Sequence, residues 1–161
     1  MVKNISLKRT RLGLVVAEFN WTITREMLNA AKAHARLRNA EIRYICFAPG
    51  TFDMPLLIEE LLKKRDVDAI VTLGSVIKGD TAHDKVVAYT AARFISELSL
   101  SHQKPVSLGI AGPGMTLKQA RDRISSVSKR AIDSAIDMVN RIRKLKNMKG
   151  DYRGGRASII D

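Results

Sequence analysis

Apolar residues along the chain gather in short runs that alternate with longer segments of helical spacing. Four runs rich in Val, Ile and Leu predict strands at 11–17, 41–47, 69–73 and 106–110. Apolar residues three or four positions apart predict helices at 23–38, 56–64 and 83–100, and a further helix with breaks from 116 to about 146. Each crossover is long enough for a right-handed β-α-β unit. The pattern predicts a three-layer α/β/α fold with a four-stranded parallel sheet.

The chain shows no repeat and no linker that would divide it. We expect one domain over 1–150 and a flexible tail over 151–161. No apolar run reaches the ~18 residues of a membrane helix, and no apolar stretch of the secretory type follows the N-terminus. The only cysteine, Cys46, excludes an internal disulfide, and its place in a strand indicates a buried, inert thiol. A cytoplasmic protein is expected.

Charge is the unusual feature of the composition, with 28 Lys and Arg against 16 Asp and Glu, a net charge of +12. The excess lies at the ends. Residues 1–11 carry +4 and residues 118–161 carry +7 (12 basic and 5 acidic), which leaves +1 for residues 12–117. Two interpretations stay open: solvated, solubilising termini, or a surface that attracts anions such as nucleic acid.

Unusual residues follow the predicted strands, where ligands of such sheets bind. The four connections are 18–21, 48–53, 74–83 and 111–116. Phe19 and Phe52 follow strand ends and are either structural or placed to sandwich a flat heteroaromatic ligand. Asn20 and Asp53 could bond the polar edge of that ligand or a polyol chain. The third connection, around Gly79, leads into a helix whose free N–H groups either bind an anion or form an ordinary cap.

The third connection also contains two charged residues and one histidine. Lys78 adds positive charge, which Asp80 opposes. His83 begins the next helix and is either a proton carrier or an exposed cap. His34 and His102 are interpreted as surface residues, and no histidine or cysteine spacing indicates a metal site. Nothing matches a P-loop or a GxGxxG turn.

Several motifs resemble one enzyme family in order and spacing. They are AEFN followed by Ile-Thr, APGTFDMP, LGSVIKGDTAHD, KPVSLGIAGPGMT and QARDR, spread from about Leu12 to Met138. Together they resemble 6,7-dimethyl-8-ribityllumazine synthase, and the IAGPGMT segment is similar to the archaeal form. The resemblance implies a flavodoxin-like fold and the penultimate step of riboflavin biosynthesis. In that step 5-amino-6-(D-ribitylamino)uracil condenses with 3,4-dihydroxy-2-butanone 4-phosphate, and phosphate and water are released. It also implies no metal and no organic cofactor.

The resemblance further implies a homopentamer, or an icosahedral shell of twelve pentamers, with active sites between subunits. It assigns proton transfer to His83 and phosphate binding to Lys78, Gly79, Asp80, Thr81 and Arg123. It assigns pyrimidine and ribityl binding to Phe19, Asn20, Thr51, Phe52, Asp53, Ser75, Val76, Ile77 and Leu108. Asp53 stands where many members have Glu, and Leu108 stands where many have Phe.

Three other interpretations are weighed against this one. A riboflavin synthase of the same lineage has no phosphorylated substrate, and the intact IKGDTAH turn argues against it. A nucleic-acid-binding protein would explain the basic ends, although no known binding motif is present. A catalytically inactive shell enclosing anionic cargo would also explain them.

Overall fold

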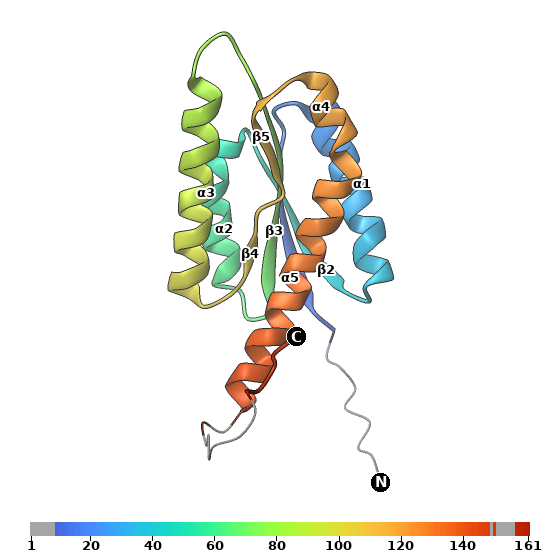
Figure 1. Ribbon diagram of the computed structural model, residues 1–161, viewed down its shortest axis with the longest axis vertical. Coiled ribbons are helices and arrows are strands. Elements are labelled where there is room, and N and C mark those ends of the chain that lie inside the picture. Colours follow the sequence, from blue (N-terminus) through green and yellow to red (C-terminus); the bar gives the residue numbers. More distant parts are fainter. Residues whose placement is uncertain (1–8, 149, 151–156) are drawn as a thin grey trace.

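The computed structural model describes residues 9–148, 150 and 157–161. A parallel sheet lies in the middle, with helices α2 and α3 on one face and α1, α4 and α5 on the other (Figure 1). This confirms the expected three layers. In chain order the elements are β1 (Arg11–Ala17), α1 (Trp21–Leu37), β2 (Glu41–Ala48), the 3-10 turn η1 (Thr51–Asp53), α2 (Met54–Leu62), β3 (Ala69–Ile77), α3 (His83–His102), β4 (Val106–Ser107), β5 (Ile110–Met115), α4 (Leu117–Asp122) and α5 (Ile124–Asn147).

The order of the strands is β2-β1-β3-β4, and β5 also pairs with β3. This is the order of a flavodoxin-like sheet, in which the chain winds one way from β1 to β2 and the other way from β1 to β3. Such a reversal opens a crevice between the carboxyl ends of β1 and β3. The fold therefore places a ligand crevice beside residues 18–20 and 75–77.

Alternation along β1 divides the core between the two faces of the sheet. Leu12, Leu14 and Val16 pack with α1 and α5, whereas Val15 and Ala17 pack with α2 and α3. Because β1 is covered on both faces, its sequence is continuously apolar. Strand β2 lies at the edge of the sheet, and alternate side chains along it are exposed. Cys46 in β2 is therefore only partly buried, and this burial raises the pKa of its thiol.

The fourth strand differs from the prediction. It is broken into β4 and β5, and β5 covers 111–115, which the sequence pattern indicated as a connection. The hydroxyl of Thr72 explains the break: it donates to the Ser107 carbonyl at 2.9 Å and accepts from the Gly109 N–H at 3.1 Å. A Cβ on Gly109 would lie 2.0 Å from the Thr72 carbonyl oxygen, so only glycine allows this approach. The sheet thus has five strands rather than four.

Strand β3 is also longer than predicted, ending at Ile77 rather than Leu73. Residues 74–77 thus belong to the strand, where Ile77 pairs with Met115 of β5. Beyond this point the connection to α3 is short. The longer strand holds Ser75, Val76 and Ile77 on a rigid element at the crevice.

Ion pairs link elements that are distant in sequence. The Arg38 guanidinium of α1 bonds Asp133 and Asp137 of α5. His34 also lies against Asp133 (2.8 Å), and His102 lies 2.7 Å from Glu59. The interpretation of both histidines as simple surface residues was wrong, since each side chain is largely covered and bonded to a carboxylate.

The ends of the chain lie partly outside the described residues, so only part of the expected flexible tail and of the basic ends can be placed. Of the tail, residues 157–161 have no helix or strand, and Asp161 bonds Lys144 of α5. Within the described part of the chain, no helix is long and apolar enough to span a bilayer.

Asp68, just before β3, fastens the amino end of the sheet. It accepts hydrogen bonds from the backbone N–H and the guanidinium of Arg11, and it pairs with Arg143 of α5 at 3.1 Å. Burial favours the neutral acid, but the Arg11 hydrogen bonds and the two positive charges outweigh it and lower the pKa of Asp68. The ionised carboxylate therefore stabilises the fold.

We predict that Asp68→Asn lowers the free energy of unfolding at neutral pH by about 1–3 kcal/mol. Since the folded-state pKa lies below the ordinary 3.8, this stability is complete above that value and is lost as the pH falls through the lower folded-state pKa. Denaturant unfolding at neutral and acidic pH should show the difference from wild type shrinking in acid. Glu60→Gln, which removes only an exposed pair with Lys63, is the matched control and should change stability little. A constant difference at all pH values would contradict the assignment.

Candidate functional site

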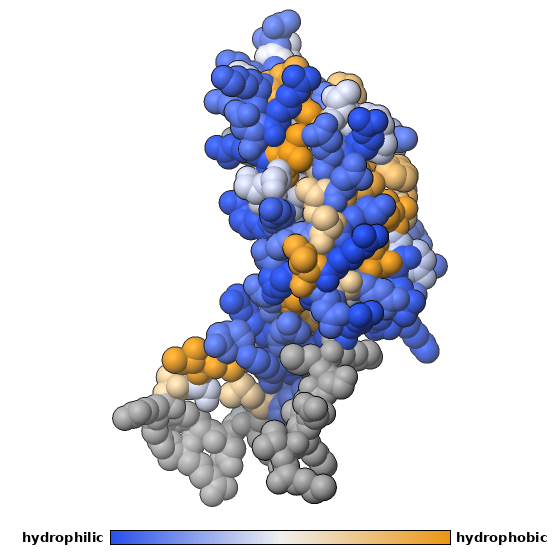
Figure 2. Space-filling model, turned by 90° about the vertical axis from the view of Figure 1, so that its right-hand side faces the viewer, coloured by the Kyte–Doolittle hydropathy of each residue, from blue (hydrophilic) through white to orange (hydrophobic). Residues whose placement is uncertain are grey.

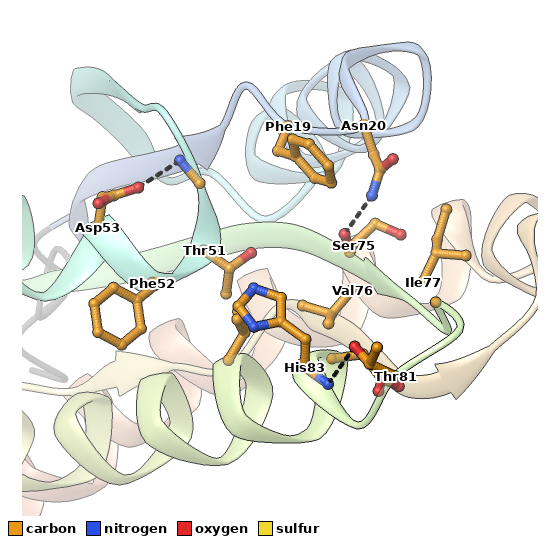
Figure 3. A pocket seen from close by; sticks show the side chains of 14 residues that line it. Phe19, Asn20, Thr51, Phe52, Asp53, Ser75, Val76, Ile77, Thr81 and His83 are labelled. Atoms are coloured by element: carbon orange, nitrogen blue, oxygen red, sulfur yellow. Dashed lines mark hydrogen bonds between the residues drawn. The ribbon is translucent and has the colours of Figure 1, made fainter.

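A cavity of about 440 Å³ opens at the carboxyl edge of the sheet, at the crevice between β1 and β3 (Figure 3). Its walls come from the end of β1, from η1, from the end of β3 and from the start of α3. We call it the first cavity. The residues lining it are Phe19, Asn20, Gly50, Thr51, Phe52, Asp53, Ser75, Val76, Ile77, Gly79, Thr81, His83, Asp84 and Val87.

Two aromatic side chains border the first cavity without being part of the core. Phe19 is 71% exposed and Phe52 is 57% exposed. A ring that supports the core is mostly covered, so neither ring supports the core of a single chain. An exposed ring beside a cavity offers a flat apolar face to a planar ligand. Trp21, which follows the same strand end as Phe19, instead packs edge-on against Phe47 of β2 with ring centroids 5.6 Å apart.

Asn20 fixes the junction between β1 and α1. It has a left-handed backbone (φ 61°), which Asn tolerates better than most residues, and it is the N-cap residue of α1. Its side chain does not cap the helix but donates from Nδ2 to the Ser75 carbonyl oxygen at 2.9 Å (Figure 3). This bond ties the end of β1 to β3 across the crevice and holds Phe19 at the rim of the cavity.

The wall formed by η1 approaches β3 closely because of a glycine. A Cβ on Gly74 would lie 2.8 Å from the Thr51 hydroxyl, so the glycine lets Thr51 sit against the strand. In the same turn one Asp53 carboxylate oxygen accepts from the Gly50 N–H at 2.9 Å (Figure 3). Asp53 therefore shapes its own loop with one oxygen and keeps the other for a ligand.

A second cavity of about 400 Å³ lies on the far side of the segment between β3 and α3. Its walls combine two lysines with the N-terminal turn of α3, whose N–H groups carry partial positive charge. A Cβ on Gly79 would touch nothing, so the backbone here is open to a ligand. The lining residues are Lys78, Gly79, Asp80, Thr81, Ala82, Asp84, Lys85 and Gly114. Both cavities share Gly79, Thr81 and Asp84.

His83, the first residue of α3, lines the first cavity (Figure 3), and its neighbours Ala82 and Asp84 line the second. Its backbone N–H donates to the Thr81 hydroxyl at 3.4 Å, and its side chain is exposed. A base at this point can exchange protons with ligands in the first cavity and with solvent.

Thirteen of the fifteen residues expected at the site line one of the two cavities; Leu108 and Arg123 do not. Leu108 lies between β4 and β5 and is 52% exposed, and Arg123 lies exposed between α4 and α5. Sequence reasoning missed Gly50, Val87, Ala82, Asp84, Lys85 and Gly114. Lys85 and Asp84 could have been found from their places in the first turn of the helix that follows the strand end.

The sheet order, the crevice and the cavities define a flavodoxin-like α/β protein with two adjoining cavities at the carboxyl edge of its sheet. Comparison with known proteins identifies the family. Residues 9–143 match the family model described as 6,7-dimethyl-8-ribityllumazine synthase. The chain belongs to this family, as the motifs indicated.

Curated relatives carry the same name. The protein of Metallosphaera sedula is 53% identical over 135 residues, which are 84% of this chain and 89% of the relative. That of Saccharolobus solfataricus is 53% identical over 142 residues, 88% of this chain and 92% of the relative. That of Methanothermobacter thermautotrophicus is 48% identical over 138 residues, 86% of this chain and 99% of the relative. All three organisms are archaea, in agreement with the archaeal form of the IAGPGMT segment.

We predict that Asn20→Ala lowers the free energy of unfolding by about 1–3 kcal/mol, because it removes the bond to Ser75 and places alanine in a left-handed conformation. Asn20→Gly removes the same bond but accepts the backbone angle, so it should cost less. Thermal or denaturant unfolding of both variants measures the two contributions separately. Equal losses would show that the backbone angle contributes nothing.

Proposed function

We propose that the chain makes 6,7-dimethyl-8-ribityllumazine in the first cavity and binds the phosphate of its second substrate in the second cavity. The substrates are 5-amino-6-(D-ribitylamino)uracil and 3,4-dihydroxy-2-butanone 4-phosphate, and phosphate and water are released. The observation that carries the proposal is the pair of adjoining cavities, one bordered by exposed aromatic rings and one by cations and a helix N-terminus. The two substrates differ correspondingly, because one has a planar ring and the other has a phosphate group.

The first cavity fits the pyrimidine and its ribityl chain. Phe19 stacks on the flat ring, while the ends of β3 at Val76 and Ile77 offer backbone groups to the ring edge. Thr51 and the free oxygen of Asp53 face the polyol chain. The Thr51 hydroxyl can donate to and accept from the hydroxyls of this chain, and the Asp53 oxygen accepts from them. Since these residues sit on strand ends and a short turn, the ring is held at a fixed angle.

The second cavity fits the phosphate. Backbone N–H groups around Gly79 and Thr81, at the start of the 20-residue helix α3, favour an anion there. Lys78 and Lys85 add two positive charges, and Asp80 and Asp84 oppose them. The shared wall of Gly79 and Thr81 places the phosphate next to the first cavity, where the carbon chain of the same substrate must reach the pyrimidine amine.

The chemistry requires little from the protein besides position and proton transfer. The 5-amino group of the pyrimidine attacks the ketone carbon, and loss of water gives an imine. The neighbouring carbon then loses a proton while elimination breaks the carbon–oxygen bond to phosphate, and the resulting enol becomes a ketone. The ribitylamino nitrogen attacks this ketone carbon and closes the second ring with loss of a second water. Because the substrates supply both nucleophile and leaving group, the protein contributes orientation, anion binding and proton transfer by His83.

We further propose that the site is completed by a second copy of the chain, in a pentamer or a shell of twelve pentamers. Leu108 and Arg123 lie outside the cavities of a single chain, yet the family resemblance assigns both to the site. Leu56 of α2 and Phe94 of α3 are exposed and line a surface pocket together with Phe52, and Tyr89 of α3 is exposed as well. The outer surface of α1, α4 and α5 is by contrast mostly hydrophilic (Figure 2). The α2–α3 face therefore suits a contact between copies.

The direct test is to mix the purified chain with both substrates and follow the lumazine absorbance together with released phosphate. The proposal expects product well above the spontaneous rate and one phosphate per lumazine. Conversion of added lumazine to riboflavin instead would favour the riboflavin synthase alternative. A background rate with large particles would favour the inactive shell.

We predict that His83→Ala lowers kcat by about 10²-fold and leaves measurable activity, because a proton carrier is one contribution among several. The kcat of the variant should also lose much of its dependence on pH. His102→Ala is the matched control: it lies at the other end of α3, bonded to Glu59, and should leave kcat unchanged. An unaltered pH profile in His83→Ala would remove His83 from proton transfer.

We predict that Arg123→Ala raises KM for the phosphate substrate far more than KM for the pyrimidine, because only the former carries the anion. Arg36→Ala, exposed in the last turn of α1 and away from both cavities, is the control. If Arg123 reaches the cavity of a neighbouring copy, refolding His83→Ala together with Arg123→Ala should restore roughly a quarter of the sites, since random pairing leaves that share intact. No recovery in the mixture would place Arg123 in its own chain's site.

A further inference from the structure

Asp84 is the one charged residue that is buried in the described part of the chain, with 7% of its surface exposed. It lies in the first turn of α3, next to His83, and it lines both cavities. The reaction as described above gives it no role. A buried carboxylate is costly unless it is hydrogen-bonded, so its place calls for an explanation.

One hydrogen bond of Asp84 joins α3 to the end of β5. Its Oδ2 accepts from the Gly114 N–H at 2.9 Å. Gly114 has φ +78°, a conformation that side-chain-bearing residues rarely adopt, and a Cβ there would meet nothing. The glycine is therefore required for its backbone angle rather than for space. The residue with this unusual angle is the same one whose N–H donates to the Asp84 carboxylate.

A second bond fastens the other end of the same segment. The Lys78 N–H donates to the Met115 carbonyl oxygen at 2.8 Å. Residues 78–84, which carry the proposed phosphate turn and His83, are thus tied at both ends to two consecutive residues of β5. The Asp84 bond joins the α3 end of this segment to β5, as the Lys78 bond joins the β3 end.

Asp84 is unsuited to bind phosphate itself, because two anions repel at short range. The N–H groups at the N-terminus of α3 stabilise its charge, and its bond to a backbone N–H satisfies one oxygen. Its geometry is that of a clamp between helix and strand rather than that of a ligand.

We propose that Asp84 is a positioning residue: by holding the Gly114 N–H it fixes the segment 78–84, and hence the phosphate turn, before substrate arrives. The proposal rests on the proposed function for its kinetic consequences. Binding costs less free energy when the site is already ordered. Loss of the Asp84–Gly114 hydrogen bond should therefore weaken binding of the phosphate substrate more than binding of the pyrimidine.

The test compares Asp84→Ala, which removes the acceptor, with Asp84→Asn, which keeps an oxygen in the same place. Asp84→Ala should raise KM for the phosphate substrate by about tenfold or more and KM for the pyrimidine by no more than about twofold. Asp84→Asn should recover most of this loss. Asp122→Ala, an exposed carboxylate at the end of α4, is the control and should match wild type. The proposal would be overturned if Asp84→Asn raised KM for the phosphate substrate as much as Asp84→Ala, or if Asp84→Ala raised KM for both substrates equally.

Amide hydrogen exchange gives a readout that needs no turnover. Gly114 is exposed, so slow exchange of its N–H in wild type depends on the bond to Asp84. We expect slow exchange in wild type and Asp84→Asn and fast exchange in Asp84→Ala. Fast exchange in folded wild type would overturn the proposal even if Asp84→Ala did not fold. Were wild type to make no lumazine, the proposed function would fail while the exchange data still judged the clamp.

Discussion

The parallel pairing of β3 with β1 on one side and with β4 and β5 on the other sets the position of both cavities. Because every strand runs in the same direction, the carboxyl ends of β1, β2, β3 and β5 lie at one edge of the sheet. The extension of β3 to Ile77, supported by β5, carries the floor of the first cavity beyond the last residue of β3 that pairs with β1, Leu73. The Asn20 bond to Ser75 then fixes the aromatic rim to this floor, and the ties from Lys78 and Asp84 fix the second cavity to β5.

In the proposed function, each of the two cavities binds one of two chemically unlike substrates. One presents exposed rings and strand-end backbone groups, and the other presents lysines and a helix terminus. Neither contains a residue that must form a covalent bond with substrate, which agrees with a reaction whose reactants bring their own nucleophile and leaving group. In the proposed function, the main contribution of the protein to the reaction is therefore to hold the segment between β3 and α3 in a fixed position.

The apolar runs predicted the position of the sheet and the layers, because burial on both faces leaves an unambiguous continuous pattern, as in β1. The break between β4 and β5 was not predictable, since it depends on the Thr72 hydroxyl reaching a strand 35 residues away. The partners of His34 and His102 are likewise distant in sequence. At the site, strand-end reasoning pointed to the aromatic rings and to the turn around Gly79, which line the two cavities. It stopped at His83 and so missed Asp84 and Lys85, whose roles depend on contacts with β5 or on a cavity wall.

Arg11, Arg38 and Arg143 pair with carboxylates of other elements, and because these charges cancel, the net charge of +12 comes from the other basic residues. The most direct measurement of the central claim is a crystal structure of the chain with inorganic phosphate and an analogue of the ribitylaminouracil. The two-cavity arrangement predicts the pyrimidine ring against Phe19, the ribityl chain beside Thr51 and Asp53, and phosphate at Gly79 to Thr81. Phosphate or ring density elsewhere, with these cavities empty, would contradict it.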